Sequence, residues 1–320
     1  MDPHELCRQS RVAIVAGKGG VGKTTVTATL ARMASRLGMS VLVVEVEGKS
    51  GLATIFGGDD LVYDEVVLAP ATPEGRGEVR ARTLTPDLAL LEYLDEHGMK
   101  RVSRRLSRSG AVEVVATATP GIKDILVLGK VKQLERAGAA DLIVLDAPAA
   151  GHAVRFLMSP RALLDTVTAG PIQSQAAEVL ELVTDPARCQ VVLVTLAEET
   201  PVNEVVETAY ALEEEVGTNL GPVVVNGLYP RREGLDVDPE VAAAEASVTL
   251  RPGEADALRA AAAFRARRQA LQASQVARLG DDLALPQLHL PALFDVRMGL
   301  PQIDHLADAL EVAVEAMEAS

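Results

Sequence analysis

Short runs of apolar residues recur along the chain and alternate with longer segments of helical character. The clearest runs are rich in Val, Ile and Leu and occupy residues 11–17, 40–47, 140–148, 189–196, 221–228 and 283–293. Continuous apolar runs of this length are typical of strands that are buried on both faces. Their alternation with helices predicts an α/β fold, in which helices cover both faces of a mostly parallel central sheet.

Two segments depart from this alternation. Residues 85–137 contain no clear buried strand and are predicted to be mostly helical, so we interpret them as a helical insertion over the edge of the sheet. A second long helix is expected over residues 254–279, which are rich in Ala and Arg. No internal repeat or linker divides the chain, and we expect residues 1–320 to form one domain that carries the insertion.

Composition and charge narrow the classes of function. The chain is 48% hydrophobic with 2% aromatic residues, so its core is built from aliphatic side chains. The formal net charge of −14 argues against a nucleic-acid partner, which requires a basic surface. The first residues lack the features of a signal peptide, and no apolar run is long enough to span a membrane. We therefore expect a cytoplasmic protein, either free or peripheral at the membrane.

A phosphate loop follows the first predicted strand. The stretch GKGGVGKTT occupies residues 17–25, between that strand and a helix expected from about residue 23. Glycines let backbone N–H groups face phosphate oxygens, and the positive end of the helix points at the same anion. Lys23 is expected at the β- and γ-phosphates, and Thr24 at Mg²⁺. The predicted nucleotide-binding residues here are Gly17, Lys18, Gly19, Gly20, Val21, Gly22, Lys23, Thr24 and Thr25.

A second lysine, Lys18, stands five residues before Lys23 and cannot occupy the same position. Its side chain is expected to leave the loop and point outward. There it would be useful to a facing copy of the protein, by neutralising charge that develops on the partner's γ-phosphate. The alternative is a solvated surface lysine.

These motifs resemble a known family. GKGGVGKTT is similar to the deviant phosphate loop of dimerising ATPases, which include the MinD/ParA proteins and the ArsA group. The stretch DAPAAGHAVRFL, at residues 146–157, resembles the switch of the ArsA group, and residues 120–131 resemble the helix that precedes this switch in the group. The ArsA group contains arsenite-pump ATPases and targeting ATPases for tail-anchored membrane proteins. The stretch at residues 44–57 and the whole layout look most like the paired ArsA-like ATPases of actinobacteria.

The resemblance implies a set of hydrolysis groups. Asp146, at a strand end, would hold Mg²⁺ through water, and Gly151 and His152 would form the switch that senses the γ-phosphate. The family orients the attacking water with an aspartate after the second strand. A gapless alignment places Glu47 there, and Glu45 lies one pleat earlier on the same side of the strand. Either glutamate could orient the water.

Adenine recognition is also implied by the resemblance. The family reads the base with an asparagine at the end of a strand, which corresponds to Asn226, since its amide offers a donor and an acceptor together. The loop at residues 290–294, with Pro291 and Leu293, resembles the loop that packs on the base. The alternative for Asn226 is a strand-end cap.

Two properties of relatives are not expected here. The insertion contains no cysteine, so a metalloid thiolate site is excluded. The paired cysteines of a zinc site between subunits are also missing, since the chain has only Cys7 and Cys189. A groove for a client segment, lined by leucines of the insertion, remains one hypothesis, and ordinary core packing of these leucines is the alternative. The leucines are Leu88, Leu90, Leu91 and Leu94.

A basic stretch in the insertion reverses the charge of the acidic chain. Helical spacing places its cations largely on one face, where they form either a patch for a partner or a solvated surface. The candidate patch consists of Lys100, Arg101, Arg104, Arg105 and Arg108.

The sequence therefore predicts a Mg²⁺-dependent ATP hydrolase that works as a nucleotide-gated dimer, either with itself or with a related ArsA-like subunit. Its output is expected to be coupling to a membrane protein, an anion transporter or a regulatory system. A chaperone for hydrophobic membrane-protein segments is one alternative. A positioning ATPase of the MinD/ParA kind is another, although the acidic C-terminal stretch is unlike a membrane-targeting helix.

Overall fold

An eight-stranded sheet forms the centre of the protein. The computed structural model describes residues 2–46, 51–96, 98–109 and 121–317. The strand order is β3-β4-β2-β5-β1-β6-β7-β8, and every neighbouring pair is parallel except β3 with β4. The strands are β1 (Val12–Gly17), β2 (Val41–Val46), β3 (Val66–Ala69), β4 (Val79–Leu84), β5 (Leu142–Ala149), β6 (Cys189–Leu196), β7 (Leu220–Leu228) and β8 (Gln287–Pro291).

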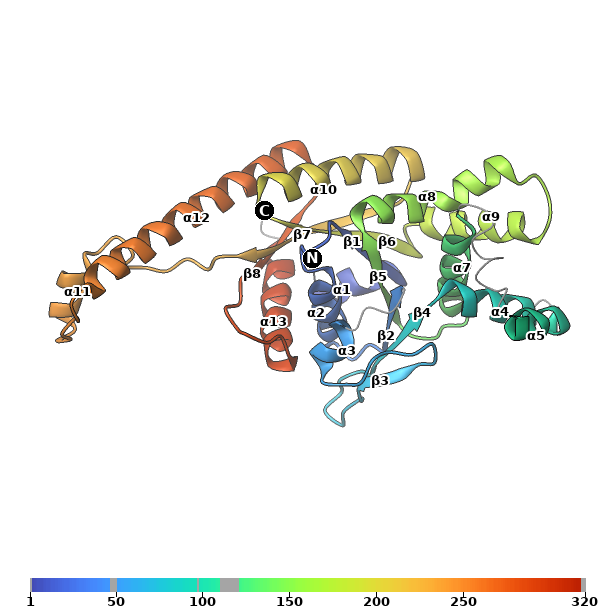
Figure 1. Cartoon of the computed structure of the whole chain (residues 1–320), viewed down its shortest axis with the longest axis horizontal. Helices are drawn as coiled ribbons and strands as arrows, with labels where there is room; N and C mark the ends of the chain where they lie inside the picture. Colours follow the sequence, from blue (N-terminus) through green and yellow to red (C-terminus); the bar gives the residue numbers. More distant parts are fainter. Residues whose placement is uncertain (1, 47–50, 97, 110–120, 318–320) are drawn as a thin grey trace.

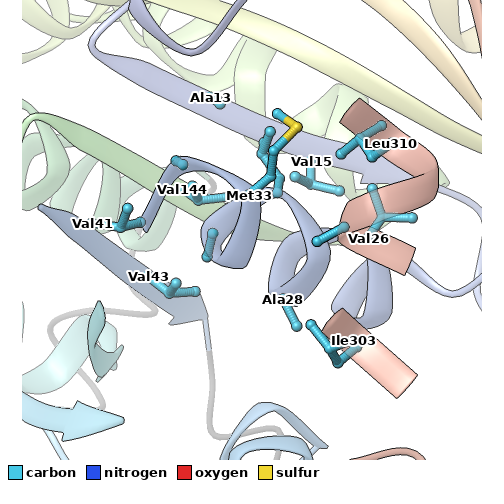
Figure 2. Packing of buried hydrophobic residues seen from close by; sticks show 14 of the residues in the cluster. Ala13, Val15, Val26, Ala28, Met33, Val41, Val43, Val144, Ile303 and Leu310 are labelled. Atoms are coloured by element: carbon cyan, nitrogen blue, oxygen red, sulfur yellow. The ribbon is translucent and has the colours of Figure 1, made fainter. Parts of the chain in front are cut away.

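One face of the sheet is covered by the two ends of the chain. Val15 and Val43 on the sheet pack with Met33 of the first long helix, and Ile303 and Leu310 close the layer from outside (Figure 2). All of these side chains are buried. The helices of this layer are α1 (Pro3–Arg8), α2 (Lys23–Arg36), α3 (Gly51–Phe56) and α13 (Leu300–Ala316).

The other face is covered by helices from the middle of the chain. Ile14 and Leu42 alternate with the residues of the first layer and pack against Leu128, Phe156 and Val179. Each such buried side chain contributes about 1.5–3 kcal/mol relative to an exposed one, which explains why both faces of every central strand are apolar. The helices are α7 (Ile122–Arg136), α8 (Ala150–Thr166), α9 (Pro171–Thr184) and α10 (Glu199–Ala211), followed by a π-helical turn (Leu212–Val216).

The predicted fold class is confirmed: the sheet is mostly parallel, and helices lie on both faces. Each of the six predicted strands is present. Strands β3 and β4 were not predicted, because β3 is an apolar run of only four residues and β4 is interrupted by arginines. Strand β4 carries Arg80 and Arg82, which both form ion pairs with Glu65. The guanidinium of Arg82 also lies over the ring of Tyr63, 4.6 Å from Cζ to the centroid.

Three helices account for the described part of the predicted insertion: α4 (Pro86–Glu96), α5 (Lys100–Ser109) and α7. Helix α7 packs directly on the sheet through Val127 and Val131, whereas α4 and α5 lie at the end of the molecule (Figure 1). The division of the chain into one domain with an insertion at residues 85–137 stays a prediction.

A long arm projects at the opposite end of the molecule (Figure 1). It consists of α11 (Pro239–Glu245) and α12 (Glu254–Asp282), and the latter extends three residues beyond its predicted end. Only Gln272 and Leu279 of α12 are buried. Within the described ranges, no helix combines the length and the apolar character that a membrane span requires.

Candidate nucleotide site

The phosphate loop lies at the carboxyl end of β1, near the centre of the sheet. From β1 the chain crosses over to β2 on one side, whereas the chain from β5 leads to β6 on the other side. Ligands of open α/β sheets bind at such a reversal, outside the carboxyl ends of the strands. The order of the strands thus places the loop at the position that this fold uses for binding.

Glycines are required at specific points of the loop. Gly20 and Gly22 have φ values of +87° and +92°, a region that side chains rarely tolerate. A Cβ atom on Gly17 would lie 2.3 Å from the carbonyl oxygen of Val194 on β6. The loop can therefore turn tightly and present its backbone N–H groups only because these residues have no side chain.

Lys23 begins α2 and spans the loop. Its side-chain amine donates a hydrogen bond to the carbonyl oxygen of Lys18 at 3.0 Å, and the residue is 8% exposed. The positive charge is therefore held inside the curve of the loop, at the amino end of a 14-residue helix. Both the ammonium group and the helix dipole favour a phosphate at this point.

Thr24 and Asp146 lie together beside the loop. The Thr24 hydroxyl donates to Asp146 Oδ2 at 2.7 Å, although 122 residues separate them in sequence. Strand β5 brings the carboxylate there, since Asp146 pairs with Val15 of β1. A hydroxyl and a carboxylate are hard oxygen donors of the kind that Mg²⁺ takes, with phosphate oxygens and water completing its octahedral shell. These residues therefore fit a magnesium ion.

A second carboxylate lies next to Asp146. Glu45 on β2 is directly opposite Asp146 on β5, and both side chains are almost completely buried. The amide of Leu52, at the start of α3, lies 3.4 Å from Glu45 Oε1. Glu47 lies outside the described residues. The choice between the two glutamates as the group that orients water therefore stays a prediction.

The side chain of Lys18 leaves the loop toward α10. Its ammonium group forms an ion pair with the carboxylate of Glu204 on α10, and the two side chains are 38% and 36% exposed. Sequence reasoning did not find Glu204, because 186 residues separate the pair and nothing local distinguishes this glutamate from its neighbours. The pair keeps the side chain of Lys18 partly exposed and directs its ammonium group to α10, while the backbone of Lys18 stays in the loop.

The residues expected at the adenine base lie near one another. Asn226 ends the buried part of β7, and its amide donates to the carbonyl oxygen of Val21 at 2.9 Å. Pro291 pairs with Leu228 of the same strand, and Leu293 packs on the edge of the core. One N–H and the oxygen of the Asn226 amide remain for a base. Base recognition by these residues stays a prediction.

Other predicted residues fall in different places. Gly151 and His152 belong to the first turn of α8, directly after β5, and their side chains lie outside the described part.

Both cysteines are buried, Cys7 in α1 and Cys189 in β6. Burial raises the pKa of each thiol to about 12, so both are protonated at neutral pH. The five cations of the candidate patch lie on α5, far from the loop (Figure 1).

The fold and the loop together define a phosphate-loop nucleotide-binding protein. Residues 10–175 match the model of a family described as anion-transporting ATPase, the ArsA ATPases. The chain belongs to this family, which confirms the predicted ArsA-group resemblance.

Several curated proteins are similar to this chain. It is 38% identical over 229 residues to ATPase BagA of Mycobacterium tuberculosis, a match that covers 69% of this chain and 66% of that protein. It is 25% identical over 243 residues to the arsenical pump-driving ATPase of Escherichia coli, covering 68% and 39%. It is 30% identical over 152 residues to ATPase get3 of Schizosaccharomyces pombe, covering 47% and 43%. The matched segments therefore span about two thirds or less of these relatives.

Proposed function

We propose that this chain is a Mg²⁺-dependent ATP hydrolase that works as a nucleotide-gated dimer. The observation that carries the proposal is the different placement of the Lys18 and Lys23 side chains. Lys23 lies inside the loop beside the Thr24–Asp146 pair, whereas Lys18 is held outside it by Glu204. One chain thus offers a complete phosphate pocket and a separate cation that faces away from it.

In this mechanism each residue has a defined task. Backbone N–H groups of the loop and Lys23 hold the phosphates, and Thr24 with Asp146 would hold Mg²⁺, which neutralises charge on the β- and γ-phosphates. A glutamate at the end of β2 orients the attacking water and accepts its proton. Lys18 of the facing subunit stabilises the charge that develops on the γ-phosphate. Cleavage of the bond to the γ-phosphate then removes the contacts that hold the dimer closed.

The dimer is tested by mass measurement in solution. Light scattering on the purified chain, with and without a nonhydrolysable ATP analogue and Mg²⁺, should show association that depends on nucleotide. A related subunit from the same organism should be added in a second run, since a heterodimer is equally compatible with the proposal. A chain that stays monomeric in every mixture, yet hydrolyses ATP, would contradict it.

The output of the cycle is proposed to be coupling to a membrane protein, an anion transporter or a regulatory system. One relative is named an arsenical pump-driving ATPase, which supports coupling to transport. Co-purification of the chain from its native membrane tests this part. A transporter or a paralogous subunit that is released by ATP would support coupling.

A second candidate is a chaperone for hydrophobic segments. An apolar cavity of about 330 Å³ lies among α4, α5, α7 and α9. Leu90 and Leu94 line it, whereas Leu88 and Leu91 do not belong to its lining. A bound apolar peptide in the co-purified material would favour this candidate over coupling.

Substitution of the candidate water-orienting residues should separate the two glutamates. We expect Glu47→Gln to bind ATP normally and to slow hydrolysis by about 10²- to 10⁴-fold, since the general base is lost while Lys23 and the rest of the phosphate loop are unchanged. Calorimetry measures binding and a single-turnover assay measures the chemical step. Glu45→Gln is the matched variant. Normal hydrolysis by Glu47→Gln, with loss in Glu45→Gln, would assign the role to Glu45.

The Lys18–Glu204 ion pair should lower the rate of ATP turnover, because it competes with the partner's phosphate for Lys18. Lys18 has to leave Glu204 before it can reach a partner's phosphate, and a pair this exposed contributes about 0.2–1 kcal/mol. We therefore expect Glu204→Gln to raise turnover by about 1.4- to five-fold at low protein concentration. Glu207→Gln, an exposed glutamate on the same helix, is the control. A lower rate in Glu204→Gln alone would mean that Glu204 positions Lys18 for catalysis instead.

A further inference from the structure

The basic surface of α5 has no role in the proposed ATPase cycle. Its five cations are exposed and fall within an arc of about 140° around the helix, at about 100° per residue. Over the described ranges, no ion pair is formed by any of them. The whole chain carries a net charge of −14, so this face is a local reversal of sign.

Two carboxylates of the neighbouring helix are directed away from these cations. Helix α4 packs on α5, but two of its carboxylates contact α7 instead. Glu92 accepts from Lys130 at 2.6 Å, and Glu96 accepts from Gln133. The charges of Glu92 and Glu96 are therefore directed toward α7, whereas the cations of α5 are exposed to solvent.

Apolar side chains border the basic face. Val102 is 48% exposed and lies on α5 between the arginines and the apolar cavity. Leu106 of α5 and Ile172 at the start of α9 line the same cavity, and Ile172 is 39% exposed. The surface thus combines a row of guanidinium groups with an adjoining exposed apolar border.

We propose that α5 docks this protein on an anionic lipid bilayer. Guanidinium groups form bidentate hydrogen bonds with lipid phosphates. Each further cation near an anionic bilayer adds to the electrostatic attraction. Val102 and Ile172 enter the interfacial region beside the headgroups, as apolar side chains of interfacial helices do. A purely charged polymer such as polyglutamate or duplex DNA would use the arginines but not this apolar border.

The position of α5 suits such docking. The helix lies at one end of the molecule, and the arm of α11 and α12 lies at the other (Figure 1). Docking through this end brings the cations to the bilayer and keeps most of the acidic chain beyond the Debye length, about 10 Å at 0.1 M salt. The proposal does not rest on ATP hydrolysis, because no phosphate-loop residue belongs to the surface.

Vesicle flotation with the full chain tests the proposal. Wild type should bind vesicles of phosphatidylcholine with 30 mol% phosphatidylglycerol, should not bind phosphatidylcholine alone, and should dissociate in 0.5 M NaCl. The triple variant Arg104→Glu, Arg105→Glu, Arg108→Glu should bind the anionic vesicles at least about 100-fold more weakly. The control triple Arg231→Glu, Arg232→Glu, Arg251→Glu changes the net charge equally at exposed sites outside α5 and should bind like wild type.

Two further variants test whether misfolding or binding by charge alone explains the result. The triple with Gln in place of Glu removes charge without reversing it and should show an intermediate loss, with an unchanged melting temperature as evidence of folding. Val102→Ser should weaken vesicle binding but leave binding to polyglutamate or duplex DNA unchanged. Equal binding of wild type and the α5 triple to anionic vesicles would overturn the proposal. Tighter binding to polyglutamate or DNA than to vesicles, with no effect of Val102→Ser, would also overturn it.

Discussion

Lys18→Ala is expected to lower ATP turnover by about 10³-fold or more while ATP binding persists. Binding should persist because Lys23 and the backbone N–H groups of the loop remain. Turnover should fall because the cation that faces the partner's γ-phosphate is gone, and a finger of this kind acts mainly on the transition state. Calorimetry with Mg²⁺ and a nonhydrolysable analogue measures binding, and phosphate release measures turnover.

Mixing two inactive variants decides whether Lys18 acts on its partner. Lys18→Ala retains an intact phosphate pocket, and Lys23→Ala retains an intact Lys18. In a mixed dimer the second chain supplies its Lys18 to the pocket of the first, so part of the activity should return. If mixed dimers form, as shown by two different affinity tags, and no activity returns, Lys18 acts within its own chain or has no role. A mixture of Lys18→Ala with Lys18→Ala carrying the other tag is the control.

Lys23→Ala is expected to weaken ATP binding by about 100-fold or more, with or without Mg²⁺. Hydrogen bonds from a charged group contribute about 1.5–3 kcal/mol each, and this ammonium group is expected at both the β- and γ-phosphates. The residue is 8% exposed and lies in the curve of the loop, so no other side chain can replace it there. Calorimetric titration of ATP gives the affinity.

A variant of the adjacent residue serves as the control for Lys23→Ala. Thr24→Val removes the hydroxyl that donates to Asp146 but keeps Lys23. It should bind ATP like wild type in the absence of Mg²⁺ and should lose the additional affinity that Mg²⁺ confers. Unchanged ATP affinity in a folded Lys23→Ala chain would remove the phosphate-loop assignment altogether.

Local patterns in the sequence were sufficient for much of the fold and for part of the site. The central strands were predictable because both faces of each are buried, which leaves an uninterrupted apolar run in the sequence. The phosphate loop was predictable because its chemistry depends on residues that are adjacent in the chain, from Gly17 to Thr24. Strand β4 was not predictable, since Arg80 and Arg82 interrupt its apolar pattern. Their contacts with Glu65 and Tyr63, which precede β3, become visible only in the tertiary structure.

The sequence by itself determined that a phosphate loop follows β1 and that the chain belongs among the phosphate-loop proteins, because glycine, lysine and threonine at fixed spacing are sufficient for that local geometry. Only the tertiary structure decided which side chains meet around the loop. Asp146 reaches Thr24 because β5 lies beside β1, and Glu204 reaches Lys18 because α10 packs near the loop. The physical reason is that such contacts depend on how the strands and helices are arranged around the sheet. The partners are 122 and 186 residues apart in the chain, so no local sequence pattern records that they meet.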